Sequence, residues 1–288
     1  MNPEPIRNAL TIDVEDYFQV SAFAPHIAPE TWDALPCRVE RNVDLILSIL
    51  DERGVHATFF TLGWIAERYP GLVRRIVERG HELASHGHAH RRASDQNPGE
   101  FLHDVTRART LLEDIGGVAV IGYRAPSFSI GKGNLWAQKA LSDAGYRYSS
   151  SVYPIRHDHY GMPDAPRFAY YPEGGGGLLE LPITTVSLFN RNLPAGGGGY
   201  FRLLPYGVSR WCLKRVNRVD RKPCIFYFHP WEIDPDQPRQ KGVGLKTRFR
   251  HYVNLSSMER RIRALCRDFQ WGRMDHLFLD AKHESARV

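Results

Sequence analysis

Residues 43–63 read VDLILSILDERGVHATFFTLG, and in this stretch a helical pattern of apolar residues is followed, after Gly54, by a continuous apolar run. Apolar residues recur at helical spacing, as at Ile46 and Leu50, which predicts a helix that ends at Gly54. The apolar run over 55–62 predicts a buried strand directly after that helix. Such a helix-to-strand joint is the unit from which parallel α/β sheets are built.

The same joint recurs three more times along the chain. Helices are expected before Gly80, before Gly116 and Gly117, and before Gly145, and a strand is expected after each. In total the sequence predicts seven strands, at residues 9–14, 55–62, 81–86, 118–124, 146–152, 177–186 and 224–233. We therefore predict an α/β fold, a distorted, TIM-like (β/α)7-type barrel. A doubly wound open sheet is the alternative.

Two parts of the chain interrupt this alternation. Residues 154–205 contain PEGGGG at 172–177 and PAGGGG at 194–199, which predict flexible turns or loops. This excursion could cover the site. Residues 240–275 are basic and partly helical, and we expect them to pack outside the barrel.

The chain is expected to form a single domain over 1–288, because 288 residues suit one large domain. Its core is expected at about 9–235, with a C-terminal helical extension at about 236–288.

The composition is that of an ordinary globular protein, with 42% hydrophobic and 24% charged residues. The formal charge of +6 indicates either a solvated basic face or attraction to an acidic polymer. No module that combines aromatic and basic residues indicates nucleic-acid binding. The four cysteines lack metal-site spacing and are expected to be reduced, mostly packed thiols; they are Cys37, Cys212, Cys224 and Cys266.

The location predicted from the sequence is the cytoplasm. The N-terminal residues MNPEPIRNAL lack the pattern of a signal peptide. No apolar run approaches the ~18 residues that a transmembrane helix needs.

Polar side chains gather at the predicted carboxyl ends of the strands, where barrel enzymes carry their chemistry. The first strand ends in TIDVED, the third in SHGHAH, the fourth in YRAPSF and the last in FYFHP. These motifs bring one acidic cluster, one histidine cluster, one arginine and one further histidine to the same face.

His86 and His90 are four residues apart, so a helical turn after Ser85 would place both imidazoles on one side. Two imidazoles and one carboxylate suit Zn²⁺ or a similar divalent ion and leave positions open for water. A histidine-rich exposed loop is the alternative, and the acids on a neighbouring strand favour the metal site.

Asp13 and Glu15 are two residues apart and point to the same side of an extended strand. One of them could ligate the metal while the other takes a proton from water. A structural role, as a helix cap or as a partner of Arg124, is the alternative, above all for Asp16. His229 is either a core histidine or a general acid for a leaving amine.

Together these motifs resemble the polysaccharide deacetylases of carbohydrate esterase family 4, the chitooligosaccharide deacetylase superfamily. The resemblance covers roughly residues 9–235, and its four motifs occur in the family's order. It implies a barrel of about seven strands and metal-dependent hydrolysis of N-acetyl groups on N-acetylhexosamine units. The sequence looks most like deacetylases from exosortase-linked exopolysaccharide loci.

The resemblance also implies roles for particular residues. Asp13 would be the general base, Arg124 would position it, and His229 would be the general acid. His86 and His90 would bind the metal, Zn²⁺ or another divalent ion such as Co²⁺. Residues expected to contact the substrate are Pro126, Ser127 and Trp231.

The sequence departs from the family's pattern at two places. Val14 follows Asp13 where the family commonly has a second aspartate, which makes Glu15 the expected third ligand and Asp16 the alternative. SSSVYP stands where the family's Trp-Asp motif would orient the histidine, so the partner of His229 is not identified.

Two other functions compete with this interpretation. One is an amidohydrolase of the same fold that acts on a small cyclic amide, allantoinase-like and without metal. The other is a non-catalytic carbohydrate-binding protein. The expected partner is an N-acetylated polysaccharide or oligosaccharide, with no nucleic acid and no integral membrane segment, while homo-oligomerisation stays open.

Overall fold

The computed structural model describes residues 5–158 and 160–279. Within them, eight strands form one sheet whose pairings are all parallel. The strands are β1 (Arg7–Val14), β2 (Thr58–Thr61), β3 (Glu82–Ser85), β4 (Gly122–Tyr123), β5 (Tyr148–Ser149), β6 (Leu179–Glu180), β9 (Ile225–Phe228) and β10 (Gln270–Gly272). Their order is β10-β1-β2-β3-β4-β5-β6, and β9 also pairs with β1. All seven predicted strands are therefore present, most of them shorter than predicted.

The sheet curls into a partial barrel, which confirms the predicted α/β class and disfavours the flat open alternative. Irregular segments bridge the gap between β6 and β9. The backbone N–H of Ile225 donates to Thr184 Oγ1 at 2.6 Å, and that of Tyr227 donates to the carbonyl of Gly196 at 2.8 Å. The parallel strands thus all direct their carboxyl ends toward one mouth of the barrel.

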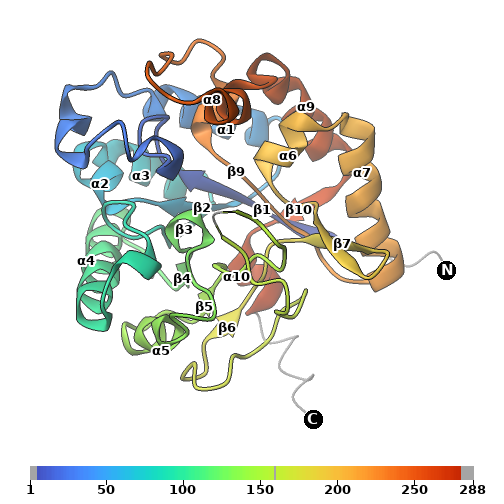
Figure 1. The fold of residues 1–288 in the computed structure, drawn as a ribbon, viewed down its shortest axis with the longest axis horizontal. Helices are drawn as coiled ribbons and strands as arrows, with labels where there is room; N and C mark the ends of the chain where they lie inside the picture. Colours follow the sequence, from blue (N-terminus) through green and yellow to red (C-terminus); the bar gives the residue numbers. More distant parts are fainter. Residues whose placement is uncertain (1–4, 159, 280–288) are drawn as a thin grey trace.

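Helices surround the sheet (Figure 1). They are α1 (Val39–Asp51), α2 (Gly63–Arg68), α3 (Pro70–Glu78), α4 (Pro98–Gly116), α5 (Trp136–Asp143), α6 (Gly198–Leu203), α7 (Tyr206–Arg215), α8 (Leu245–Tyr252), α9 (Leu255–Asp268) and α10 (Met274–Phe278). The predicted glycine joints are present. At the end of α4, for example, Gly117 has φ of 65°, and its N–H donates to the carbonyl of Glu113 at 2.8 Å. Glycine adopts this left-handed conformation without the steric cost of a Cβ.

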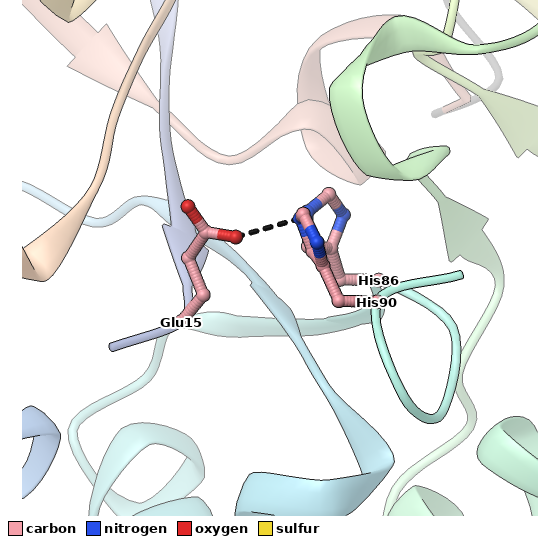
Figure 2. A group of neighbouring side chains, drawn as sticks. All are labelled: Glu15, His86 and His90. Carbon is pink, nitrogen blue, oxygen red and sulfur yellow. Dashed lines mark ion pairs between the residues drawn. The ribbon is translucent and has the colours of Figure 1, made fainter. Parts of the chain in front are cut away.

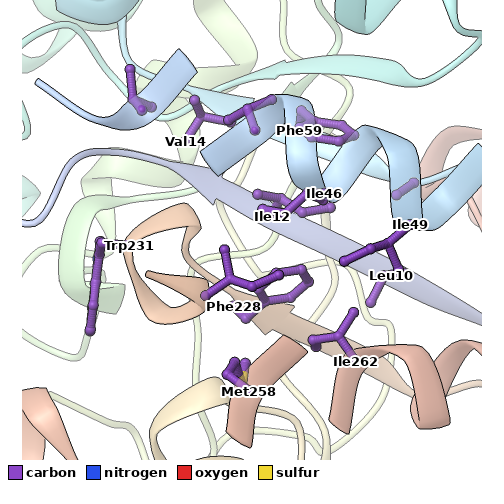
Figure 3. Packing of buried hydrophobic residues seen from close by; sticks show 14 of the residues in the cluster. Leu10, Ile12, Val14, Ile46, Ile49, Phe59, Phe228, Trp231, Met258 and Ile262 are labelled. Atoms are coloured by element: carbon purple, nitrogen blue, oxygen red, sulfur yellow. The ribbon is translucent and has the colours of Figure 1, made fainter. Parts of the chain in front are cut away.

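The largest core cluster surrounds β1. Leu10, Ile12 and Val14 are fully buried, with α1 on one side and α9 on the other (Figure 3). Helix α9 packs outside the sheet, as expected for residues 240–275. The expectation was wrong for β10, because these three residues join the sheet and pair with the start of β1.

The excursion at 154–205 differs from its prediction in part, because residues 173–177 form turns as expected. It forms an antiparallel hairpin of β7 (Thr185–Leu188) and β8 (Arg191–Pro194). Gly196 and Gly197 pack against β9, and Gly198 packs against Glu232, which follows β9. A Cβ on Gly198 would lie 2.3 Å from the carboxylate of Glu232, so only glycine permits this close approach.

Over the described residues, no helix is both long enough and apolar enough to cross a bilayer. All four cysteines are unpaired, and three of them are buried.

Candidate metal and catalytic site

The carboxyl ends of three strands bring the predicted acids and histidines into one cavity of about 240 Å³. Asp13 and Glu15 come from the end of β1, where the N–H of Glu15 donates to the carbonyl of Asp13 at 3.0 Å and tightens the turn. His86 and His90 follow β3, and His229 follows β9. Residues more than two hundred positions apart in the chain therefore line the same space.

Glu15, His86 and His90 converge as a potential ligand set (Figure 2). One candidate ligand atom from each lies within 4.8 Å of the other two, and all three residues are buried. Glu15 Oε2 lies 2.7 Å from His90 Nε2 yet accepts no hydrogen bond of acceptable geometry from any described group. A buried carboxylate oxygen without a donor, facing two imidazoles, fits a divalent cation.

The protonation states suit this assignment. His86 Nδ1 lies 2.9 Å from the carbonyl oxygen of Arg124, which favours Nδ1–H as the donor and leaves Nε2 as a lone-pair ligand. Burial lowers the pKa of His86 to about 4, so its ring is neutral at pH 7. Burial opposes ionisation of Glu15, but His90 and His229 outweigh it and hold the pKa of the carboxyl well below its usual range.

The segment from 86 to 90 is a loop, not the helical turn that the spacing suggested. Gly87 has φ of 76° and His90 has φ of 53°. Helix α2 holds the loop, because the N–H of Gly63 donates to the carbonyl of Gly87 and the N–H of Trp64 to that of His88, both at 2.9 Å. The two imidazoles converge because the backbone changes direction at these residues, not because they lie one helical turn apart.

Two neighbouring acids have different surroundings. Glu15 accepts a hydrogen bond from Trp231 Nε1 at 3.1 Å, which orients its carboxylate toward the histidines. Asp16 instead accepts from the backbone N–H groups of Arg38 and Val39, at the start of α1. Asp16 thus has the alternative role considered above, that of a helix cap, and it lies outside the ligand set.

Arg124 holds Asp13 in the barrel interior. Its Nη1 donates to Asp13 Oδ1 at 2.5 Å and to Thr11 Oγ1 at 2.8 Å, and its other nitrogens donate to Ser150. Arg124 is fully buried and Asp13 is almost fully buried. The guanidinium keeps a permanent positive charge beside the carboxylate and leaves Asp13 Oδ2 facing the cavity, 4.0 Å from His229 Nε2.

His229 has partners that the sequence analysis did not identify. Its Nδ1 lies 2.8 Å from Glu232 Oε1, and Arg202 Nε donates to Glu232 Oε2 at 2.6 Å. Arg202 in turn donates to the backbone carbonyls of His251 and Val253, so the C-terminal extension holds this chain of contacts in place. The spacing H-P-W-E, with an acid three residues after a turn-initiating position, is a capping-box signal that could have revealed Glu232. No local signal points to Arg202.

The acids raise the proton affinity of His229. Burial opposes its protonation, but Glu15, Glu232 and Asp13 outweigh this effect and raise the pKa of the imidazole to about 9. Burial likewise opposes ionisation of Glu232, while Arg202 and His229 lower the pKa of that carboxyl to about 2. His229 is therefore placed to donate a proton from Nε2, with Nδ1 held by an anion.

The three residues expected to contact substrate lie in different positions. Ser127 and Trp231 line the cavity, and Ser127 Oγ lies 2.5 Å from Ser21 Oγ. Pro126 is buried and is not among the residues that line the cavity. It begins the turn in which Ser127 has φ of 55°. Aromatic lining residues that the sequence analysis missed are Phe128, Tyr160 and Tyr227.

Two family models cover most of the chain. Residues 26–149 match the polysaccharide deacetylase family, and residues 150–279 match a domain of unknown function, DUF3473. The structure is also similar to the crystal structure of a protein from Mycobacterium smegmatis assigned as a polysaccharide deacetylase. The TM-score is 0.62 at 22% identity, over 99% of this chain and 92% of the other. That similarity shows the fold.

Curated relatives match over shorter stretches. A peptidoglycan-N-acetylglucosamine deacetylase from Bacillus cereus is 33% identical over 93 residues, which are 32% of this chain and 34% of the relative. A chitooligosaccharide deacetylase from Bradyrhizobium sp. is 32% identical over 97 residues, 34% of this chain and 42% of the relative. The match thus spans about a third to two fifths of these relatives. Residues 26–149 of this chain are thus similar to polysaccharide deacetylases.

Proposed function

We propose that this chain is a metal-dependent hydrolase that removes N-acetyl groups from N-acetylhexosamine units of a polysaccharide and releases acetate. One observation carries the proposal: a buried ligand set, a buried carboxylate and a histidine with its own anionic partner all face a single cavity. The family match and the names of the relatives support an amide bond of an acetylated sugar as the target.

Glu15, His86 and His90 would hold the divalent ion, Zn²⁺ or another such as Co²⁺. When bound, such an ion lowers the pKa of water and polarises a carbonyl group. Trp231 orients the carboxylate of Glu15, and the carbonyl of Arg124 orients the imidazole of His86.

Two side chains of the protein, Asp13 and His229, transfer the protons that the reaction requires. Asp13, held by Arg124 through Oδ1, accepts a proton from the attacking water through Oδ2. The water oxygen forms a bond to the acetyl carbon, and the bond from that carbon to nitrogen breaks. His229, whose protonated form is stabilised by Glu232, donates from Nε2 the proton that the departing amine takes up and becomes neutral. The products are a free amino sugar and acetate.

The form of the site is consistent with a polymer as substrate. The cavity of about 240 Å³ is smaller than a typical pocket for a small molecule, so it would take an acetamido group and part of its sugar. The rest of the chain would then lie outside. On the resemblance to exosortase-linked deacetylases, the polymer would be an exopolysaccharide, whereas the relatives point to peptidoglycan or chitooligosaccharides. Both matched segments contribute strands to one sheet, so we treat the chain as a single domain.

Acetate release from N-acetylglucosamine oligomers, peptidoglycan and acetylated exopolysaccharide tests the proposal. We expect turnover by the metal-loaded protein, and we expect His86→Ala to lose both turnover and bound metal. Metal content is measured independently by elemental analysis. If the protein hydrolyses allantoin but no acetylated sugar, the cyclic-amide alternative is correct. If it binds glycan without releasing acetate, it is a binding protein.

A further inference from the structure

Helix α7 continues into a turn of π-helix, η5 (Val216–Asp220), and one side of this combined helix is buried. Its buried residues are Ser209, Cys212, Leu213 and Val216, which pack toward the barrel. A second side carries apolar residues that are exposed to solvent: Val208 at 42%, Trp211 at 49% and Val219 at 62%. These positions recur at near-helical spacing and form a stripe that is interrupted at Arg215, whose guanidinium carbon lies 5.8 Å from the centre of the Trp211 ring.

The β7–β8 hairpin extends this apolar surface. It packs on α7 through a small buried cluster of Val186, Ala195 and Cys212. Its outer residues are not buried: Phe189 at the hairpin turn is 97% exposed, and Leu193 is 42% exposed. Figure 1 shows β7 beside α7 at the right of the molecule. We call the exposed residues of α7, η5 and this hairpin the α7 face.

Cations lie next to the α7 face. A cavity of about 1050 Å³ adjoins α7 and η5, and the charged residues that line it are Arg7, Arg53, Lys214, Arg218, Arg221, Arg267 and Asp268. Six of the seven are therefore basic. The carboxylate of Asp268 is already within 3.0 Å of Arg210 and Arg267, and it accepts a hydrogen bond from Tyr206. Among the described residues, no ion pair neutralises Lys214, Arg218 or Arg221.

We propose that the α7 face and the adjoining basic cavity bind the surface of an anionic lipid bilayer. Clustered cations would contact lipid phosphates, and exposed Trp211 and Phe189 would enter the boundary between headgroups and acyl chains. A dissolved polyanion would account for the cations but would leave the apolar stripe uncovered. Attraction to an acidic partner also agrees with the net charge of +6.

This surface is separate from the catalytic cavity. The basic cavity is lined by residues at or just before the starts of β1, β2 and β10, whereas the catalytic residues follow the ends of strands. A bilayer bound there would leave the catalytic mouth open to a glycan. The inference does not depend on the proposed deacetylase activity, and its test requires no turnover.

The experiment measures binding of the full chain to sedimented vesicles. One set is phosphatidylcholine alone, and the other contains about a quarter phosphatidylglycerol as the anionic lipid. Tryptophan emission gives a second readout, because Trp211 is the one tryptophan of six with an exposed side chain, and all six lie in the described ranges. We expect binding to the anionic set only, weakening with salt, with a blue shift in emission.

Four variants separate the contributions. The pair Lys214→Glu and Arg218→Glu should weaken binding by about 30-fold or more, since each cation near the surface contributes about 1 kcal/mol. Trp211→Ala should weaken it by about tenfold and abolish the blue shift. Matched controls near α5, far from α7 in Figure 1, are Lys132→Glu with Lys139→Glu and, separately, Leu135→Ala, whose side chain is 45% exposed. Both controls should bind as the wild type does.

Three results would overturn the proposal. The first is equal binding to both vesicle sets or to neither. The second is anionic binding that the control substitutions reduce as strongly as the α7 substitutions do. The third is binding to soluble polyphosphate that matches binding to vesicles and brings no emission shift, which would make the cavity a polyanion site.

Discussion

Glu232→Gln is the substitution that most directly tests how His229 is positioned. In the structure both carboxylate oxygens accept hydrogen bonds: Oε1 from the N–H of His229, with Nδ1 of the same residue also at 2.8 Å, and Oε2 from Arg202. Glutamine has the same shape but only one accepting oxygen. Whichever way its amide is turned, an NH₂ group must face either His229 or Arg202.

The size of the effect follows from those contacts. A hydrogen bond to a charged partner contributes about 1.5–3 kcal/mol, and the variant loses one such bond together with the negative charge beside the imidazole. If that contribution is present when His229 donates its proton, the turnover number falls by about 10- to 150-fold. The proposed metal ligands keep their contacts, so the metal content should stay at the wild-type value.

The assay is acetate release from an N-acetylglucosamine oligomer, with the turnover number and KM measured separately and bound metal determined on the same sample. Glu40→Gln is the matched control, because it removes the same charge from a surface pair with Arg75. A decrease of less than threefold in turnover number, or a decrease that appears only as a higher KM, would refute the role assigned to Glu232. Loss of metal together with turnover would mean that the residue supports the ligand set instead.

Three further predictions concern the ligands, the buried ion pair and the response to acid. Glu15→Gln should bring bound metal close to zero by elemental analysis. Asp16→Asn should keep the metal. It should lower the free energy of unfolding in urea by about 1–3 kcal/mol, because it weakens the hydrogen-bond acceptor at the start of α1. Arg124→Met should lower the free energy of unfolding by about 3–5 kcal/mol, because it leaves the charge of Asp13 buried and unpaired; an unchanged unfolding midpoint would contradict this. Burial lowers the pKa of His81 to about 3 from about 6.5 in the unfolded chain, so its stabilisation is complete above pH 6.5 and is lost as the pH falls toward 3. Between pH 8 and pH 5 this loss is about 2 kcal/mol, and His81→Asn should remove that part of the pH dependence.

The barrel could be predicted because its determinants are local. Helical spacing that ends at a glycine, followed by an apolar run, marks each unit of a parallel sheet, and the register of the sheet then brings the strand ends together. β10 could not be predicted in this way. Its three residues, Gln270–Gly272, are too short for periodicity and become a strand only because the start of β1 offers a free partner.

The proximity of the proposed metal ligands could be predicted for a similar reason. Glu15 lies at the end of a buried strand and His86 at the end of another, so their positions in the sequence already place both at the same end of the barrel. The conformation of the loop that carries His90 could not be predicted, because it depends on hydrogen bonds from α2 to the carbonyls of Gly87 and His88. The convergence of these side chains was therefore easier to predict than the conformation of the loop that carries them.

The partners of His229 show where sequence reasoning reaches its limit. Glu232 lies three residues away and has a recognisable spacing, but Arg202 becomes a partner only because Gly198 lets α6 approach the carboxylate closely. The matched deacetylase segment, 26–149, contains His86 and Arg124, but it contains neither Glu15 nor His229. On the proposed function, the segment of unknown function at 150–279 supplies the proton donor and its anchors, while β1 supplies the base and the residue directly after β1 supplies a ligand. The active site would then be a property of the whole curled sheet, and neither matched segment could carry out the reaction alone.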